Sequence, residues 1–186
     1  RQVDKGRGLN RKQRRNRMSF KSKSQGLWIL AIDRTEWKGR NIFMVTLAWG
    51  THALPVYWEV LDHVGNSNLA AQKRLLKNVL PLFKPHSVIV LGDREFHSPH
   101  LAQWLQSKHT YFALRQKKSL YFKEHLNEEY KVLKQQGFRP GMSKFYQDIY
   151  CNKGDNLGTF NLAVYWKRKY RNKSSKDPWY ILTNLP

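Results

Sequence analysis

The stretch LWILAID, residues 27–33, is an unbroken apolar run that ends in an acidic residue. A run of strand length without polar alternation is typical of a β-strand that is buried on both faces of a sheet. A second run of this kind, SVIVLGD at residues 87–93, also ends in an aspartate. The two runs predict the centre of a sheet, with Asp33 and Asp93 where the apolar part of each strand ends.

The segments around these two runs predict the rest of an α/β fold. A turn at residues 38–41 separates the first two strands, Pro55 suggests the start of the third, and Asn66 or Ser67 can cap the first helix. The further expected elements are, in chain order, strands at 42–49 and 54–61, a helix at 67–83, a helix at 98–107 and a strand at 111–114. This order matches the RNase H-like mixed sheet with strand order 3-2-1-4-5, in which the first and fourth strands are neighbours.

The composition of the chain divides it into four parts. Residues 1–25 contain ten Lys and Arg but only one acid, Asp4, so we interpret them as a basic arm that contacts a polyanion, DNA, and residues 26–115 as the RNase H-like core. Residues 116–178 are polar, basic and aromatic with period-2 alternation, so they are expected to form a β-rich insertion. That insertion includes a hairpin of residues 143–150 and 157–166. Residues 179–186 are expected to return to the core as a strand.

The charge of the chain predicts a polyanionic partner. The 186 residues contain 34 Lys and Arg but only 13 Asp and Glu, a formal net charge of +21. Such an excess most often serves nucleic-acid binding, although a basic ribosomal or membrane-surface protein is the alternative. The single cysteine, Cys151, excludes an intrachain disulfide and a thiolate zinc site and fits a reducing cytoplasm. The longest apolar runs have strand length, so no membrane partner is expected.

Asp33 and Asp93 are the candidate metal ligands. Carboxylates at the ends of neighbouring strands repel each other, and a divalent cation relieves this repulsion. Hard oxygen ligands select Mg²⁺ or Mn²⁺, and two such ions can promote phosphoryl transfer between them. The structural alternative is that each aspartate only caps the junction between a strand and the following turn.

Three short motifs carry a family resemblance. IDRT at residues 32–35, GNS at residues 65–67 and GDREF at residues 92–96 resemble segments of bacterial insertion-sequence DDE transposases of the cut-and-paste group. These transposases interrupt an RNase H-like core with a β-rich insertion, which matches the position of residues 116–178. WYILTN at residues 179–184 resembles the strand that closes this insertion, so the resemblance covers nearly all of residues 26–186.

The resemblance implies an enzyme that cleaves DNA and transfers strands at the ends of an insertion sequence. Asp33 and Asp93 would be its catalytic metal ligands, with two Mg²⁺ or Mn²⁺ ions in the complete enzyme. Its partners would be transposon-end DNA and target DNA. The full-length protein would form a homodimer in the synaptic complex, and it would be located in the bacterial cytoplasm in association with the nucleoid.

The resemblance also implies a third acidic ligand beyond this sequence. In the family, a helix with a Y-x₂-R-x₃-E-x₆-K signature follows the returning strand, and its glutamate completes the DDE triad. That helix is expected after Pro186, and both ends of the sequence resemble cuts through a longer protein. The fragment alone is therefore expected to be inactive. Glu36 and Glu95 are possible substitute ligands, but their positions favour pairing with nearby arginines.

The residues expected to contact DNA fall into three groups. They are Arg34, Thr35 and Arg94 beside the aspartates; Arg11, Lys12, Arg14, Arg15 and Arg17 in the arm; and Trp166, Lys167, Arg168 and Lys169 in the insertion. The two arginines beside the aspartates can instead form salt bridges that hold the acids in place. The cluster in the insertion can instead lie on a solvated edge strand, because lysines on an edge strand also prevent it from pairing with another chain.

Two further readings of the chain remain open. The first is another RNase H-like nuclease, such as a junction resolvase or a ribonuclease, which shares the first strand aspartate but not the large insertion. The second is a non-catalytic DNA-binding remnant of a transposase. His97 and His100 have helical spacing, but no further zinc ligands lie nearby in the sequence, so packing at a helix start is the favoured interpretation.

Overall fold

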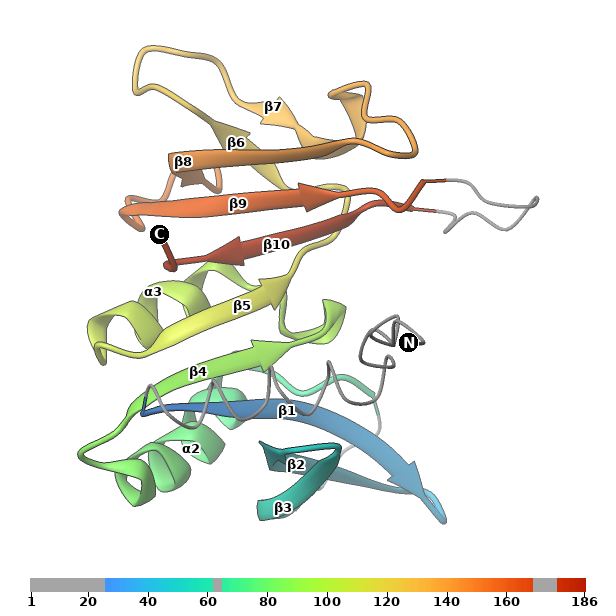
Figure 1. The fold of residues 1–186 in the computed structure, drawn as a ribbon, viewed down its shortest axis with the longest axis vertical. Helices are drawn as coiled ribbons and strands as arrows, with labels where there is room; N and C mark the ends of the chain where they lie inside the picture. The colour runs from blue at the N-terminus through green and yellow to red at the C-terminus, as the bar shows by residue number, and fades with distance from the viewer. Residues whose placement is uncertain (1–25, 62–64, 169–176) are drawn as a thin grey trace, which may run out of the picture.

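The computed structural model describes residues 26–61, 65–168 and 177–186, and its strands form one mixed β-sheet (Figure 1). The strands are β1 (Leu27–Trp37), β2 (Arg40–Trp49), β3 (His52–Leu61), β4 (Ser87–Gly92), β5 (Tyr111–Arg115), β6 (Tyr121–Lys123), β7 (Lys131–Val132), β8 (Ser143–Cys151), β9 (Thr159–Tyr165) and β10 (Trp179–Thr183). The helical segments are α2 (Leu69–Val79) and α3 (Pro99–Ser107), and the 3₁₀ helices η1 (Leu80–Phe83), η2 (Arg94–Phe96) and η3 (Leu133–Gln135).

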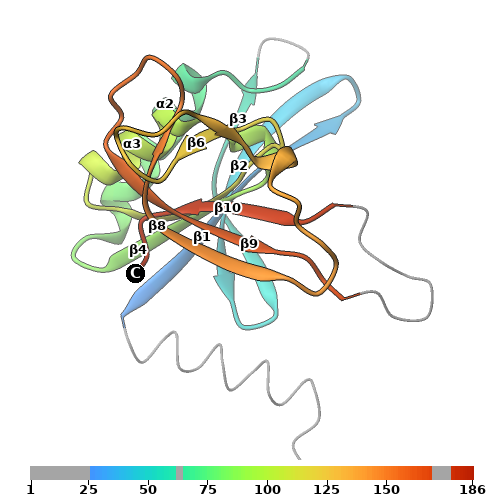
Figure 2. The same cartoon turned by 90° about the horizontal axis from the view of Figure 1, so that it is seen from above.

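The strand order confirms the predicted fold class. The described strands are arranged β3-β2-β1-β4-β5-β10-β9-β8-β6-β7. β1 to β3 form an antiparallel meander, and β1, β4 and β5 are parallel to one another, as in the RNase H-like sheet. β10 pairs with both β5 and β9, so the strands of the β-rich region continue the same sheet. Seen from above, the sheet has the strong twist that sheets of L-amino acids adopt (Figure 2).

The first hairpin is longer and tighter than predicted. β1 continues past Asp33 to Trp37, and the connection to β2 consists only of Lys38 and Gly39. Both residues have positive φ values, 48° and 74°, as a type I′ turn requires. The predicted turn at residues 38–41 is therefore too long, because residues 40 and 41 already pair with β1.

The sequence suggested that Pro55 starts the third strand, and this prediction is wrong. β3 begins three residues earlier, at His52, and its register against β2 shifts where Thr46 pairs with Pro55. Proline donates no backbone hydrogen bond, so it is tolerated on an edge strand or at an irregularity, and here both conditions hold.

The helix after the meander is shorter than predicted. Its N-cap is Asn68 rather than Asn66 or Ser67, and the Asn68 side chain accepts a hydrogen bond from the Ala71 amide at 2.9 Å. The α-helix changes to the 3₁₀ helix η1 at Leu80, next to Pro81, which has no amide to extend the α-helical ladder.

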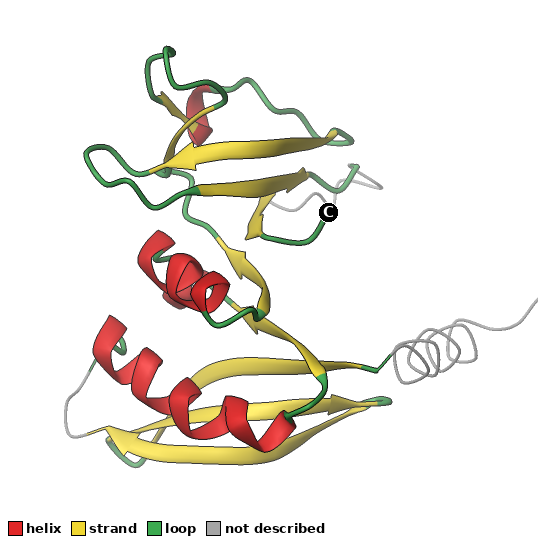
Figure 3. Ribbon diagram, turned by 90° about the vertical axis from the view of Figure 1, so that its left-hand side faces the viewer, coloured by secondary structure: helices red, strands yellow, loops and turns green. Residues whose placement is uncertain are grey.

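Both α-helices lie on the same face of the sheet (Figure 3). Leu75 and Leu76 of α2 and Leu101 and Leu105 of α3 are fully buried in this layer. In β1 the burial alternates: Leu30 and Ile32 are buried, while Ile29 and Ala31 are only half-buried. The prediction that this strand is buried on both faces is therefore wrong within the described residues, since the helices cover one face only. None of the described helices is long and apolar enough to cross a bilayer.

Candidate active site

Asp33 and Asp93 lie on neighbouring parallel strands. β1 and β4 pair in parallel from Leu27 with Ser87 to Ile32 with Gly92, and the two aspartates are the next residues of each chain segment. Parallel strands that are in register end at the same edge of a sheet. The predicted adjacency of the two strands is confirmed, and we call this end of the sheet the carboxylate edge.

Strand alternation places both aspartates on the face opposite the helices. Leu30 and Val90 are register partners in the helix-covered layer, and the odd-numbered residues of each strand face the other side. Asp33 and Asp93 are both exposed. One oxygen of each carboxylate accepts a backbone hydrogen bond, Asp33 Oδ1 from the Arg34 amide at 2.8 Å and Asp93 Oδ1 from the Glu95 amide at 2.9 Å. Thr35 shares the face of Asp33 and is also exposed.

Arg34 is held by a salt bridge on the helix-covered side. Its Nε donates to Oε2 of Glu95 at 2.9 Å and to Oε1 at 3.1 Å. Its two terminal nitrogens donate to the side-chain oxygens of Asn41, at 2.8 Å, and Asn66, at 3.3 Å. All three nitrogens of this guanidinium thus have a protein partner, and the side chain is only 18% exposed.

Glu95 is the centre of this polar network. Besides Arg34, it accepts hydrogen bonds from the Ser67 amide at 2.8 Å and the Ser67 hydroxyl at 2.7 Å, both at Oε1. Burial opposes ionisation of Glu95, but the hydrogen bonds from Ser67 and Arg34, together with the charge of Arg34, leave the pKa of its carboxyl below the ordinary value. The network joins β1, β2, the GNS segment and η2, so it explains why these separate motifs occur together.

The network contains the salt bridge that the sequence left open as the alternative for Arg34, while contact of Arg34 with DNA stays a prediction. Each guanidinium nitrogen donates to a protein oxygen, and the two terminal nitrogens each carry a second N–H that can donate to a phosphate. The same contacts make Glu95 a poor substitute metal ligand. No group of three or more His, Cys, Asp or Glu side chains in the described ranges is placed to hold a metal ion.

Gly92 and Phe96 complete the explanation of the GDREF motif. A Cβ atom on Gly92 would lie 2.8 Å from Cβ of Phe96 and 3.0 Å from a methyl carbon of Leu114. Phe96 is fully buried and stacks on Phe43 with 5.6 Å between the ring centroids. Glycine is therefore needed because η2 folds back closely over the end of β4, which fixes the backbone on both sides of Asp93.

Two arginines, Arg94 and Arg115, lie near Asp93 at the carboxylate edge. Arg94 is exposed, and with Lys117, Lys118 and Asp177 it lines a cavity of about 330 Å³. Burial lowers the pKa of the Arg115 guanidinium, repulsion by Arg94 adds to this lowering, and Asp93 opposes it. Arg115 also lies over the Trp179 ring, with 4.6 Å between its Cζ atom and the ring centroid.

The sequence analysis missed Arg115, Lys117 and Lys118. The available signal was their position directly after a strand parallel to β4, which brings them to the same edge as Asp93.

The basic cluster of the insertion ends at this same edge. β9 is antiparallel to β10, which is antiparallel to β5, so β9 runs in the direction of β4 and its end points to the carboxylate edge (Figure 1). Trp166, Lys167 and Arg168 follow β9, and the latter two are exposed. β9 lies three strand positions from β4, or about 14 Å across the sheet. Lys169 and the predicted DNA contacts of the arm, from Arg11 to Arg17, lie outside the described residues.

The two histidines do not form a zinc site with other described residues. His97 precedes α3, and His100 lies in its first turn. His100 Nε2 is 3.4 Å from Oδ2 of Asp155, in the turn between β8 and β9. The packing role at the start of the helix stays a prediction.

Comparison with known proteins gives one family match. A family model described as "Transposase DDE domain" matches residues 24–182. No curated protein matches the sequence. Among solved structures, the piggyBac transposase synaptic complex with hairpin DNA is similar with a TM-score of 0.49 and 18% identity, over 84% of this chain and 33% of that one. Marinitoga piezophila Argonaute with guide RNA and target DNA has a TM-score of 0.34 and 9% identity, over 86% and 22% of the two chains. The chain thus spans about a third or less of the length of these proteins.

Proposed function

Because this chain belongs to the transposase DDE domain family, we propose that it carries out Mg²⁺-dependent cleavage and strand transfer of DNA at insertion-sequence ends. Asp33 and Asp93 are the proposed catalytic carboxylates. The observation that carries this assignment is their position at the ends of the paired segments of two neighbouring parallel strands, on the face that the helices leave open. We expect their carboxylates to be about 4 to 6 Å apart, the width of a shared metal site.

The two side chains fit a divalent cation. Each carboxylate has one oxygen, Oδ2, to which no other described residue donates a hydrogen bond, and both side chains are exposed. Hard oxygen ligands of this kind suit Mg²⁺ or Mn²⁺. When bound, such ions activate the attacking oxygen and stabilise the leaving oxygen in an in-line phosphoryl transfer.

The residues around the pair hold its geometry. The Arg34–Glu95 salt bridge is formed by the residue directly after Asp33 and the residue two places after Asp93, and it restrains both segments. Since no described residue completes a three-ligand group, we propose that a third carboxylate comes from another segment of the protein. We also propose that the complete site holds two ions. The division of the chain into an arm (1–25), a core (26–115), an insertion (116–178) and a returning strand (179–186) is part of the same proposal.

The basic residues at the carboxylate edge are proposed to bind DNA. Arg94 directly follows Asp93 and shares a cavity with Lys117, Lys118 and the acidic Asp177, and Lys167 and Arg168 follow β9 at the same edge. The net charge of +21 supports contact with the phosphate backbone. We further propose transposon-end and target DNA as the partners and a homodimer as the synaptic form.

Metal binding is the first test. In isothermal titration calorimetry with Mn²⁺, we expect weak binding by the chain and its loss in Asp33→Asn and Asp93→Asn. Asp155→Asn, which removes an exposed carboxylate elsewhere, is the matched control and should bind as the unchanged chain does. Equal binding by all four proteins would contradict the assigned site.

Catalysis is the second test. In the full-length protein, either asparagine substitution should abolish nicking and strand transfer while DNA affinity is kept or increased, because negative charge beside the phosphates is removed. The 186-residue chain should not cleave at a useful rate, since loss of one member of a catalytic unit removes most of its rate enhancement. Metal-dependent nicking without strand transfer would favour a hydrolytic nuclease instead.

A further inference from the structure

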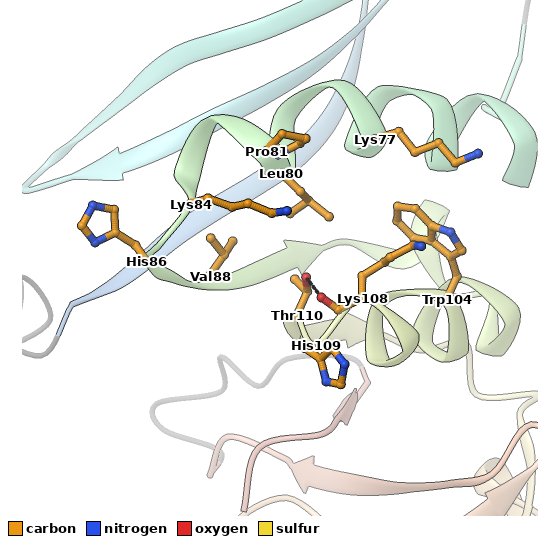
Figure 4. Close-up of a pocket in the computed structure, with 10 residues that line it drawn as sticks. All are labelled: Lys77, Leu80, Pro81, Lys84, His86, Val88, Trp104, Lys108, His109 and Thr110. Atoms are coloured by element: carbon orange, nitrogen blue, oxygen red, sulfur yellow. Dashed lines mark hydrogen bonds between the residues drawn. The ribbon is translucent and has the colours of Figure 1, made fainter.

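A second basic pocket lies away from the carboxylate edge (Figure 4). It has a volume of about 340 Å³ and lies between the end of α2 with η1, the start of β4 and the end of α3. Its polar and aromatic lining includes three lysines, two histidines and one tryptophan: Lys77, Lys84, Lys108, His86, His109 and Trp104.

The pocket is at the opposite end of the parallel strands from the aspartates. Val88, the second residue of β4, and Thr110, just before β5, line it, whereas Asp93 follows the last residue of β4. The six residues of β4 span about 20 Å at 3.3 Å per residue. A group bound in this pocket therefore does not contact Asp33 or Asp93.

The lysines of the pocket have no acidic partner among the residues that the structure describes. No carboxylate lines the pocket, and none of the three lysines forms an ion pair within the described part of the chain. They come from three different segments, and Figure 4 shows Lys84 extending between η1 and β4 while Lys108 extends toward Trp104. Positive charges gathered in this way repel one another, and an anion between them relieves the repulsion. Lysine is a common phosphate ligand because it acts as a compact positive charge.

The rest of the lining suits a nucleoside rather than a free ion. Leu80, Pro81 and Val88 provide apolar surface beside the lysines, and the Trp104 indole is partly exposed. Nucleic acid bound without sequence preference combines these two features, a positive surface for the backbone and an aromatic ring against a base.

We propose that this pocket binds a backbone phosphate and the adjoining nucleoside of DNA, as a contact separate from the one at the carboxylate edge. Lys84 and Lys108 bind the phosphate, and Trp104 packs against the nucleoside. The chain would then hold DNA at two places about 20 Å apart along the strands. This binding does not require Asp33 or Asp93 to be catalytic, so it can be tested without metal and in the Asp33→Asn background.

The first experiment observes the pocket directly. The indole N–H resonance of Trp104 is identified in a ¹H–¹⁵N NMR spectrum by its loss in Trp104→Phe, which keeps an aromatic ring in the packed position. We expect this resonance to shift on addition of a short single-stranded or duplex oligonucleotide, and to be unchanged by both in Lys84→Ala/Lys108→Ala. A shift with inorganic phosphate but with neither oligonucleotide would overturn the assignment to DNA, and so would the absence of any shift.

The second experiment measures the charge contribution. For duplex DNA, each neutralised phosphate contributes about −0.9 to the slope of log K against log salt concentration. Lys84→Ala/Lys108→Ala should therefore reduce the magnitude of the slope by up to about 1.8. The charge-matched control is Lys123→Ala/Lys153→Ala, whose amines lie over tyrosine rings of the insertion, and it should leave the slope unchanged. If Lys84→Ala/Lys108→Ala and Lys123→Ala/Lys153→Ala have the same salt-dependence slope, the pocket does not bind the DNA backbone.

Discussion

Arg34 and Glu95 form a salt bridge with an Nε–Oε2 distance of 2.9 Å, although they are 61 residues apart in the sequence. The pair is mostly shielded from solvent, with side-chain exposures of 18% and 12%. Arg34 directly follows Asp33 and Glu95 lies two residues after Asp93, so the pair connects the two segments that must keep a common geometry.

The first prediction concerns the stability that this pair provides. Glu95→Ala leaves the Arg34 guanidinium and the Ser67 hydroxyl without their main acceptor, and it should destabilise the chain by about 2 to 4 kcal/mol. Urea unfolding followed by circular dichroism measures this loss. Lys131→Ala breaks a more exposed ion pair with Glu128 and should cost much less stability than Glu95→Ala. Equal losses in the two variants would contradict the structural role of the Arg34–Glu95 pair.

The second prediction is a pH dependence that follows from the lowered pKa of Glu95. A carboxyl group whose pKa is lower in the folded than in the unfolded state stabilises the fold above its unfolded pKa. That stabilisation is lost as pH falls from the ordinary value of 4.5 through the lowered folded value. The difference in unfolding free energy between the unchanged chain and Glu95→Gln should therefore be constant between pH 6 and 7 and decrease below about pH 4.5. Urea midpoints across this range provide the measurement, and a difference that grows on acidification would refute the assignment.

The third prediction concerns the close approach at Gly92. Gly92→Ala places a methyl group 2.8 Å from Cβ of Phe96, which is backbone-proximal and cannot rotate away. We expect a loss of about 1 to 3 kcal/mol from this overpacking, together with weaker Mn²⁺ binding because the segment carrying Asp93 must move. Unchanged stability and unchanged metal binding would show that η2 can shift without cost.

The fourth prediction concerns the single cysteine. Cys151 is buried, and burial raises the pKa of its thiol to about 12. Because the thiolate is the reactive form, the folded chain should react very slowly with a disulfide reagent at pH 8, and reaction should become fast in denaturing urea. Rapid labelling of the folded chain would contradict the burial of Cys151.

The fifth prediction tests the basic residues at the carboxylate edge. Lys117→Ala/Lys118→Ala should reduce the magnitude of the salt-dependence slope for duplex DNA by up to about 1.8. Deletion of residues 1–23, which contain every charged residue of the arm, should reduce it as well. If the slope is kept when both lysines are replaced, the edge beside Asp93 does not contact the backbone.

Most of the core was predictable from the sequence because its strands are marked by local patterns. The apolar runs before Asp33 and Asp93 identify β1 and β4, and the order of the surrounding elements identifies the 3-2-1-4-5 sheet. The motifs at residues 32–35 and 92–96 identified the family that the match over residues 24–182 then showed. These features depend on residues that are neighbours in the chain, so they can be read without the fold.

The roles of individual polar side chains were decided only by the tertiary structure. The sequence left Arg34 equally suited to a phosphate or to a salt bridge, and it assigned the helix cap to Asn66 or Ser67. In the folded chain Glu95 binds both Arg34 and Ser67, and Asn68 is the residue that caps the helix. Likewise, only the sheet order brings the segment after β5 to Asp93 and gathers Lys77, Lys84 and Lys108 in one pocket. The physical reason is that apolar periodicity specifies which segments form strands, whereas a hydrogen-bond partner is chosen among groups that become neighbours only when those strands have paired.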